Sequence, residues 1–308
     1  MSGVAAQART VFPASARCAT LPSQGLFTLT GLALKQPDTE SSMATFAHWT
    51  AIALYLATAA VAALSLKPHI RPNKVLLLAL LAGAVVLHGC SLVTTLADPS
   101  GYRFDLLAML SLVAWTVNLL ILILAIRNPL QLLILVLAPV GALTEFVSGH
   151  PWGAAAVRHQ LSAGLAVHAL LSICAYSLLT IATLQAIYLH YVNQQLHNHN
   201  PGLITRRLPP LQTMESLLFG LITFGQLLLT ASLVTGFLFV DDLFAQHLVH
   251  KTALSILAWL LYSILLWGHW RLGWRGNTAV RWALSAFAAL LLAYFGSKLV
   301  LEVILQRG

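Results

Sequence analysis

Eight long apolar runs constrain the fold of this chain more than any other feature of its sequence. Each run comes close to or exceeds the about 20 residues that an α-helix needs to cross a bilayer. Backbone polar groups cannot stay unpaired in hydrocarbon, so such runs must form helices. We therefore predict an all-α membrane protein, a polytopic bundle of about eight transmembrane helices, at residues 44–66, 75–97, 105–126, 130–147, 161–190, 215–240, 248–270 and 279–304.

The composition supports this class and excludes others. Hydrophobic residues make up 58% of the chain and charged residues only 8%, far from the balance of a soluble domain. The net charge of +8 is spread over short connections, so it does not indicate nucleic-acid binding. Cys18, Cys90 and Cys174 form no CxxC pair, which argues against thiol redox chemistry and covalent haem attachment. No nucleophile–base pair or phosphate loop stands out, and we expect no enzyme activity.

The first 42 residues differ from the rest of the chain. They contain charged residues and three prolines, and they hold no apolar run long enough to span a membrane. Met43 stands where the first run begins. We predict that residues 1–42 are a disordered N-terminal extension or the result of a misassigned start, and that residues 43–308 form one eight-helix transmembrane domain.

The basic residues of the connections predict the orientation. One alternate set of connections holds nine Lys and Arg, and the other set holds five. The richer set is Lys67, Arg71, Lys74, Arg127, Arg206, Arg207, Arg271, Arg275 and Arg281, and the poorer set is Arg103, Arg158, Lys251, Lys298 and Arg307. The connections of the poorer set also carry acidic residues, which are Asp98, Asp105, Glu145, Asp241 and Asp242. The positive-inside rule then places the richer set in the cytoplasm and both termini outside.

Histidines are the unusual part of the composition, because the 12 histidines outnumber Asp and Glu together. The predicted topology places His88, His168 and His250 at a similar depth near the outer face. A single histidine in a span is usually a packing residue that is hydrogen-bonded. Three at one level favour a ligand site.

The residues around these histidines suit haem better than a bare metal ion. Zinc or copper needs three or four ligands in a tight shell, but no predicted span has an HxxxH or HExxH spacing. The nearest carboxylates, Asp241 and Asp242, lie in a predicted loop. Haem needs only one or two axial imidazoles and a broad apolar wall, for which the candidates are Trp152, Tyr176, Trp259 and Tyr262. The residues alone indicate a pocket for haem or another small apolar ligand.

Helical spacing groups the polar residues of the fifth and seventh spans. Ser172 and Tyr176 share the helical face of His168, and Lys251, Ser255, Trp259 and Tyr262 share a face of the seventh span. Ordinary helix packing explains the second group equally well. We predict that His168 and His250 face each other and bind the iron of one non-covalent haem b, with His88 as a third or alternative ligand.

The stretches at residues 164–189 and 250–300, with their WxxY, GWRG and YFG motifs, resemble the cytochrome c assembly family. This is the CcsA/ResC/CcmC group of membrane haem-handling proteins, and the closest likeness is to its compact eight-span, HemX-like branch. The resemblance covers about residues 43–305. It implies haem binding and handling at the periplasmic face of the bacterial inner membrane, in support of cytochrome c biogenesis. The implied partners are the lipid bilayer, haem and other biogenesis membrane proteins.

The resemblance also implies roles for single positions. His168 occupies the place of an outer-face haem-ligating histidine, and His88 that of the first intramembrane histidine. The family's tryptophan-rich haem-presenting motif is absent, and residues 237–251 stand in its place. The second intramembrane histidine falls at Trp267, and the last outer histidine has no counterpart. A non-catalytic membrane adaptor or regulator, for example of tetrapyrrole synthesis or of a partner transporter, is therefore the alternative. A transporter of some other ligand is a weaker third hypothesis.

Overall fold

The computed structural model describes residues 39–67, 73–98, 101–103, 106–149, 158–159, 162–197, 211–239 and 246–296. Within these residues, eight helices are long and apolar enough to cross a membrane, which confirms the predicted all-α fold class. They are α1 (Thr39–Leu64), α2 (Lys74–Leu96), α3 (Leu106–Arg127), α4 (Gln131–Ser148), α5 (Ala163–His197), α6 (Leu211–Phe239), α7 (Gln246–Leu272) and α8 (Gly276–Leu291). Residues 1–38 lie outside the described part, and residues 39–42 already belong to α1.

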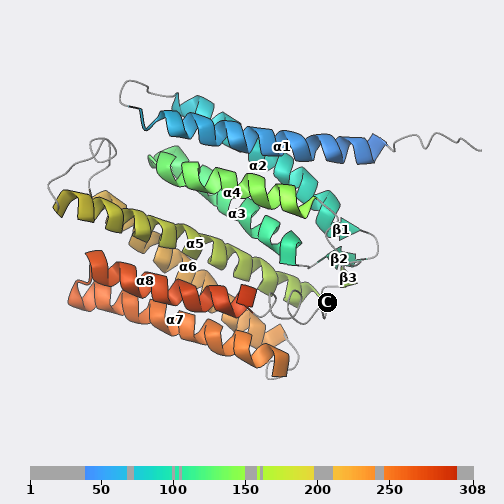
Figure 1. Ribbon diagram of the computed structural model, residues 1–308. Helices are drawn as coiled ribbons and strands as arrows, with labels where there is room; N and C mark the ends of the chain where they lie inside the picture. The colour runs from blue at the N-terminus through green and yellow to red at the C-terminus, as the bar shows by residue number, and fades with distance from the viewer. Residues whose placement is uncertain are drawn as a thin grey trace, which may run out of the picture. The chain divides into compact units, whose positions relative to one another are not determined.

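The first four helices pack against one another. α1 contacts α2 and α4, and α3 contacts α2 and α4 (Figure 1). α3 and α4 form a tight hairpin, because α3 ends at Arg127 and α4 begins at Gln131, as the short gap between the predicted spans 105–126 and 130–147 requires. Inside this hairpin the buried side chain of Asn118 donates Nδ2–H to the carbonyl of Leu137 at 3.3 Å. α4 continues as a helix through Pro139.

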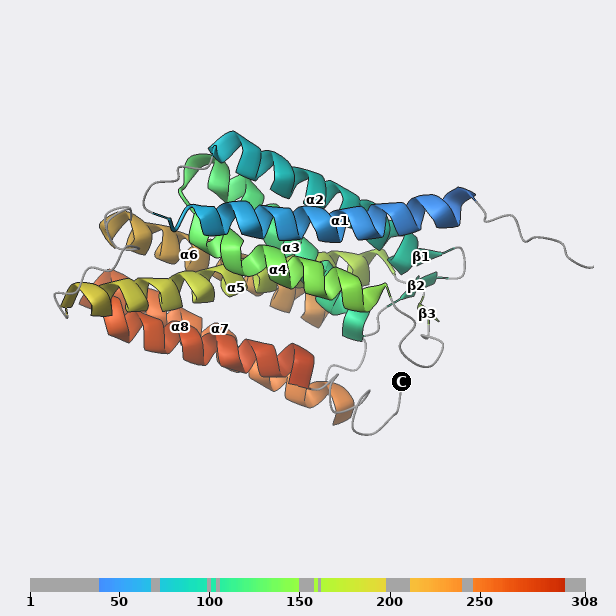
Figure 2. The ribbon, with the colours of Figure 1, turned by 45° about the horizontal axis from the view of Figure 1, so that its top comes forward.

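The last four helices form a second group. α5 packs along α6 and against α8, and α7 contacts both α6 and α8 (Figure 2). With 35 residues, α5 is longer than a membrane crossing needs, as is the predicted span 161–190. The turn between α7 and α8 uses glycines with positive φ, 67° at Gly273 and 56° at Gly276, a conformation that side chains with a Cβ rarely adopt. A π-helical segment, Leu292–Gly296, continues from α8.

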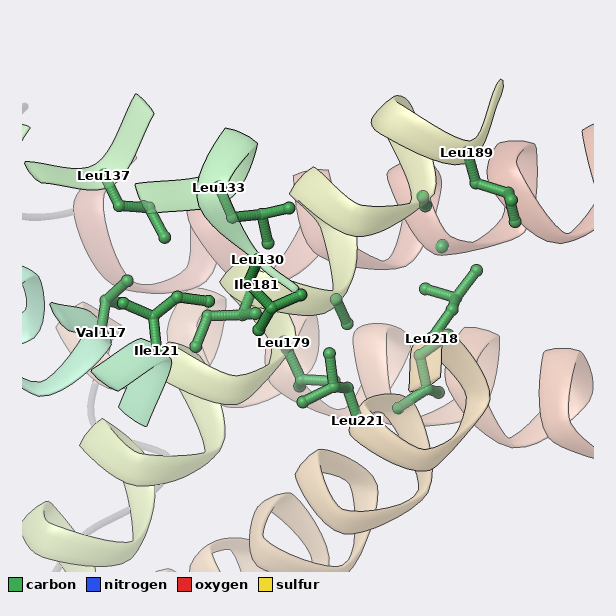
Figure 3. Close-up of a cluster of buried hydrophobic side chains, with 14 of the residues drawn as sticks. Val117, Ile121, Leu130, Leu133, Leu137, Leu179, Ile181, Leu189, Leu218 and Leu221 are labelled. Atoms are coloured by element: carbon green, nitrogen blue, oxygen red, sulfur yellow. The ribbon is translucent and has the colours of Figure 1, made fainter. Parts of the chain in front are cut away.

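The two groups meet through a core of branched apolar side chains. Figure 3 shows side chains of α3, α4, α5 and α6 in this cluster, among them Ile121, Leu133, Leu179 and Leu218. Lipid tails are as apolar as leucine, so these contacts stabilise the bundle through close packing rather than through exclusion of water.

A small sheet at one end of the helices was not predicted. Its strands are β1 (Ala97–Asp98), β2 (Gly101–Arg103) and β3 (Arg158–His159), all antiparallel neighbours in that order. Tyr102 pairs with His159, so the connection after α2 is joined to the connection before α5. Short antiparallel strands of this kind satisfy backbone groups at a point where the chain leaves its helices.

Candidate functional site

A cavity of about 370 Å³ lies among α3, α5, α6, α7, α8 and the π-helical segment. Its volume falls in the range of about 300–1,000 Å³ that is usual for small-molecule sites. Most of the lining is apolar, with a few hydroxyl groups, one imidazole and one ammonium group. The lining residues are Met109, Val113, Leu165, His168, Ala169, Ser172, Ile173, Tyr176, Leu229, Ser232, Leu233, Gly236, Phe237, Lys251, Thr252, Ser255, Leu290, Ala293 and Tyr294.

His168 presents one ring nitrogen in the form that ligates a metal. Its Nδ1 lies 2.8 Å from the carbonyl oxygen of Ser232 on α6. A carbonyl only accepts hydrogen bonds, so Nδ1 carries a proton, and in the neutral imidazole Nε2 then has the lone pair. No residue in the described part of the chain hydrogen-bonds this Nε2 atom. Metal-binding histidines are typically oriented in this way, with the other ring N–H donated to a carbonyl or carboxylate.

Small residues on α6 let the imidazole lie against that helix. A Cβ atom at Gly236 would come within 3.0 Å of Cε1 of His168, closer than a relaxed packing contact. Ser172 donates its hydroxyl to the carbonyl of His168 at 2.7 Å, and its oxygen lies 2.7 Å from the hydroxyl oxygen of Ser232. Since Ser172 has given its proton to the carbonyl, Ser232 is the donor in the serine pair. These contacts tie α5 to α6 beside His168.

Three other predicted residues also reach the cavity. Tyr176, Lys251 and Ser255 line it together with His168 and Ser172. The ring of Tyr176 packs against Tyr294, with 6.2 Å between ring centroids. Tyr294 belongs to the π-helical segment, a type of distortion that is frequent at functional sites.

Two aromatic residues predicted for the wall are not among the cavity-lining residues. Trp259 donates Nε1–H to the hydroxyl of Thr230 at 2.9 Å, so it joins α7 to α6. Tyr262 is fully buried in the core. Relative to Lys251 they lie about 12 and 16 Å farther along the helix axis, beyond the cavity. The side chains of His250 and Trp152 lie outside those that the structure describes, so the pairing of His168 with His250 stays a prediction.

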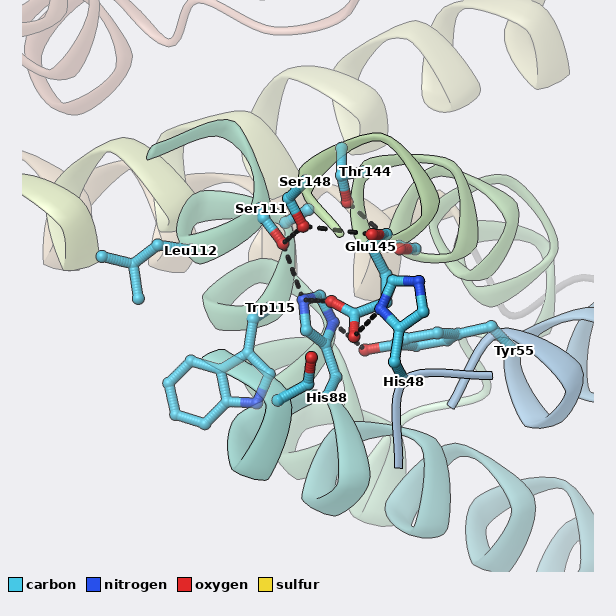
Figure 4. Close-up of polar contacts among 12 residues, drawn as sticks. His48, Tyr55, His88, Ser111, Leu112, Trp115, Thr144, Glu145 and Ser148 are labelled. Atoms are coloured by element: carbon cyan, nitrogen blue, oxygen red, sulfur yellow. Dashed lines mark hydrogen bonds and ion pairs between the residues drawn. The ribbon is translucent and has the colours of Figure 1, made fainter. Parts of the chain in front are cut away.

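His88 lies in a different polar cluster. It is fully buried, its Nδ1 lies 3.1 Å from the hydroxyl oxygen of Tyr55, and its Nε2 lies 2.9 Å from Ser111 Oγ and 2.9 Å from Glu145 Oε2 (Figure 4). Both ring nitrogens therefore have partners. α3 separates this cluster from the cavity, because Ser111 contacts His88 while Met109 lines the cavity. The structure brings His88 together with Glu145 and not with His168.

Two members of this cluster escaped the sequence analysis. Glu145, counted there with the acidic residues of the outer connections, instead lies within α4 with only 1% of its surface exposed. His48 was not predicted as a site residue, although its Nδ1 lies 3.0 Å from Oε1 of Glu145. These residues come from different helices, so no sequence spacing relates them. The one available signal was a lone carboxylate inside a predicted span, which usually has a function.

The described part of the chain contains no group of three or more His, Cys, Asp and Glu side chains that could hold a metal ion. The contacts of Glu145 with His48 and His88 are therefore hydrogen bonds rather than a preformed metal shell.

Comparison with known families identifies the class. Residues 84–305 match the cytochrome C assembly protein family. This match covers more than half of the chain, and the chain belongs to that family, as the resemblance predicted.

Individual relatives agree with this assignment. The chain is 33% identical to inner membrane protein YpjD of Escherichia coli (strain K12) over 205 residues, which are 67% of this chain and 78% of YpjD. YpjD of Escherichia coli O157:H7 matches to the same extent. An Azospirillum brasilense protein described as an uncharacterized 28.8 kDa protein in the nifR3-like 5' region is 33% identical over 141 residues, 45% of this chain and 52% of that protein. No solved structure matches the chain. The eight spanning helices and YpjD together support a multi-pass protein of the inner membrane.

Proposed function

We propose that this protein binds and handles haem at the periplasmic face of the membrane, in support of cytochrome c biogenesis and without covalent chemistry. The observation that carries the proposal is His168, whose Nδ1–H is held by the Ser232 carbonyl while Nε2 has no hydrogen-bond partner among the described residues. An imidazole nitrogen with no hydrogen-bond partner beside an apolar cavity could hold haem iron. Membership of a cytochrome c assembly family supports haem as the ligand.

The residues present fit a planar, largely apolar group with acidic substituents. The aliphatic and aromatic lining, including Tyr176 and Tyr294, can cover the macrocycle. Lys251 lines the same cavity and can pair with a propionate carboxylate. When bound, haem would supply an iron that imidazole nitrogens can ligate. The role of the chain is to bind it, orient it through His168 and shield it from water, with His250 as the predicted second ligand.

The alternative is a non-catalytic adaptor or regulator built on the same scaffold. The observation that favours it is the absence of the tryptophan-rich presenting motif between Phe237 and Lys251, together with Trp267 at a position where the family resemblance expects a histidine. A protein of this kind would keep the bundle without carrying haem as cargo.

An absorption spectrum of the detergent-purified protein, with and without added haem, separates these functions. We expect uptake of haem with a low-spin, bis-imidazole spectrum. His168→Ala and His250→Ala should each convert or abolish that spectrum, because each removes one axial ligand. His197→Ala, at the other end of α5, is the control and should match wild type. A wild-type protein that takes up no haem would overturn the proposal and favour the adaptor.

We also propose that both termini face the periplasm, because the connections rich in Lys and Arg are predicted to be cytoplasmic. In a cysteine-free background, an impermeant thiol reagent applied to intact cells should label Phe244→Cys and leave His199→Cys unlabelled. Both positions lie outside the described residues, so the test rests on sequence alone. The reverse labelling pattern would invert the assigned orientation.

A further inference from the structure

The cluster formed by His48, Glu145 and His88 lies apart from the proposed haem cavity. Its side chains come from α1, α4 and α2, and the carboxylate stands between the two imidazoles (Figure 4). Their exposure falls along the series, from 12% for the side chain of His48 to 1% for Glu145 and 0% for His88. A carboxylate buried at membrane depth needs a compensating charge or a proton of its own.

Among the described side chains of α1 to α4, only histidine lies close enough to supply that charge. α1 and α4 contain no Lys or Arg, α2 contains only Lys74, and α3 contains only Arg127. Lys74 is about 21 Å along α2 from His88, and Arg127 is about 24 Å along α3 from Ser111. An unneutralised buried carboxylate costs several kcal/mol, so an imidazolium or a proton on the carboxyl group must balance it. Two neutral imidazoles and an ionised carboxylate would leave the cluster with a single net negative charge. The three side chains together therefore hold one additional proton.

The hydrogen-bond arrangement allows this proton to lie on either imidazole. Glu145 lies 3.0 Å from Nδ1 of His48 through Oε1 and 2.9 Å from Nε2 of His88 through Oε2, and both distances are those of hydrogen bonds. At neutral His88, Nδ1–H can donate to the Tyr55 hydroxyl while Nε2 keeps its lone pair and accepts from the Ser111 hydroxyl, so a further proton is taken up at Nε2. Both protonation states of His88 are thus compatible with one arrangement of heavy atoms.

We propose that His48, Glu145 and His88 form an intramembrane proton-binding site that exchanges its proton with water through His48. His48 lies three residues after Thr45, where the membrane-spanning part of α1 begins, so it is about 4.5 Å from that boundary. A proton taken from water by His48 passes from Nδ1 to Oε1 of Glu145. Rotation of the carboxyl group then delivers it to Nε2 of His88. Nothing but the proton is consumed or released.

The path ends inside the bundle. Among the described side chains of these four helices, the other ionisable groups near the site are Tyr55, which is fully buried, and Cys90, which is exposed on α2. Ser111 contacts His88 but does not ionise, and Ser148 donates its hydroxyl to Ser111 at 3.2 Å. The site therefore stores a proton and does not conduct it across the bilayer.

Nitrogen NMR of the haem-free protein, labelled with ¹⁵N-histidine and held in lipid nanodiscs, tests the shared proton. Spectra of His48→Gln and His88→Gln assign the two rings. At neutral pH the pair should carry one imidazolium in total. Glu145→Gln should leave both rings neutral, while Glu215→Gln on α6 should change neither. Two neutral rings in the wild type, or an imidazolium that persists in Glu145→Gln, would overturn the proposal.

Access through His48 is tested by deuterium exchange in the same samples. Exchange of the ring N–H protons of His88 should slow at least tenfold in His48→Gln, while His197→Gln should match wild type. Unchanged exchange in His48→Gln would overturn the proposed entry path, even if Glu145→Gln fails to accumulate. Because every sample is free of haem, these outcomes do not depend on the proposed haem-handling function.

Discussion

His88 and His168 are both histidines inside apolar helices, and they differ in what their second ring nitrogen contacts. In the first group of helices, both nitrogens of His88 are hydrogen-bonded and the ring is fully buried. In the second group, Nδ1 of His168 is hydrogen-bonded to a carbonyl, and His168 lines a cavity. Its Nε2 has no hydrogen-bond partner among the described residues. The partners of the ring, more than its depth in the membrane, decide whether an intramembrane histidine can bind a ligand.

The neighbouring helix accounts for the difference. α4 brings a carboxylate to His88, and a buried carboxylate binds an imidazole too strongly to release it at low cost. α6 brings only a backbone carbonyl and a glycine to His168. A carbonyl orients the ring and leaves the second nitrogen available. α3 contributes to both sites, because Ser111 contacts His88 while Met109 lines the cavity.

The largest expected effect is on stability. His88→Ala leaves the buried Glu145 with one partner fewer, and we expect it to lower the free energy of unfolding by about 3–5 kcal/mol. His168→Ala should cost only about 1 kcal/mol, the value of one ordinary hydrogen bond. Thermal unfolding of the haem-free proteins in one detergent measures both. Equal losses in the two variants would contradict the different roles assigned to the two histidines.

The next effect concerns the approach of His168 to α6. Gly236→Ala places a Cβ 3.0 Å from Cε1 of His168, so the ring must shift by a few tenths of an ångström. We expect haem affinity, measured by spectroscopic titration, to fall about tenfold to a hundredfold, as when the support of a metal ligand is disturbed. Gly220→Ala on the same helix is the matched control, because a Cβ there meets nothing within 4 Å. If both variants bind haem like wild type, the close packing of His168 on α6 is not needed for binding.

A smaller effect is expected at Ser232. Ser232→Ala removes the hydroxyl that donates to Ser172 but keeps the carbonyl that accepts from His168. The loss of one buried hydrogen bond should lower the free energy of unfolding by about 1 kcal/mol. Haem affinity should change less than in Gly236→Ala. A loss of haem binding as large as in His168→Ala would mean that the hydroxyl, and not the carbonyl, positions the ring.

The smallest effect is expected at the N-terminus. A chain that begins at Met43 lacks residues 39–42 of α1 but keeps His48 and Tyr55. Membrane level, haem uptake and thermal unfolding should all match those of the full-length chain. A collapse in the membrane level would show that residues 1–42 are needed for insertion.

Local sequence was sufficient for the spans and for one side of the proposed haem site. The eight apolar runs, the tight turn at Arg127, the long fifth span and the shared face of His168, Ser172 and Tyr176 all follow from length and from the helical period. These features depend on residues that are close together in the chain. The family assignment also came from local motifs, and the comparison with known proteins confirms it.

Which helix lies beside which was decided only by the tertiary structure. Neither the pairing of Glu145 with His48 and His88 nor the carbonyl of Ser232 beside His168 could be read from spacing, because their partners are 97, 57 and 64 residues apart in the chain. The same holds for Trp259, which shares a helical face with Lys251 but contacts Thr230 instead of the cavity. In a bilayer every span is apolar, and the hydrophobic pattern carries little information about neighbours. Small and polar residues determine the packing, and their partners become visible only when the helices are assembled.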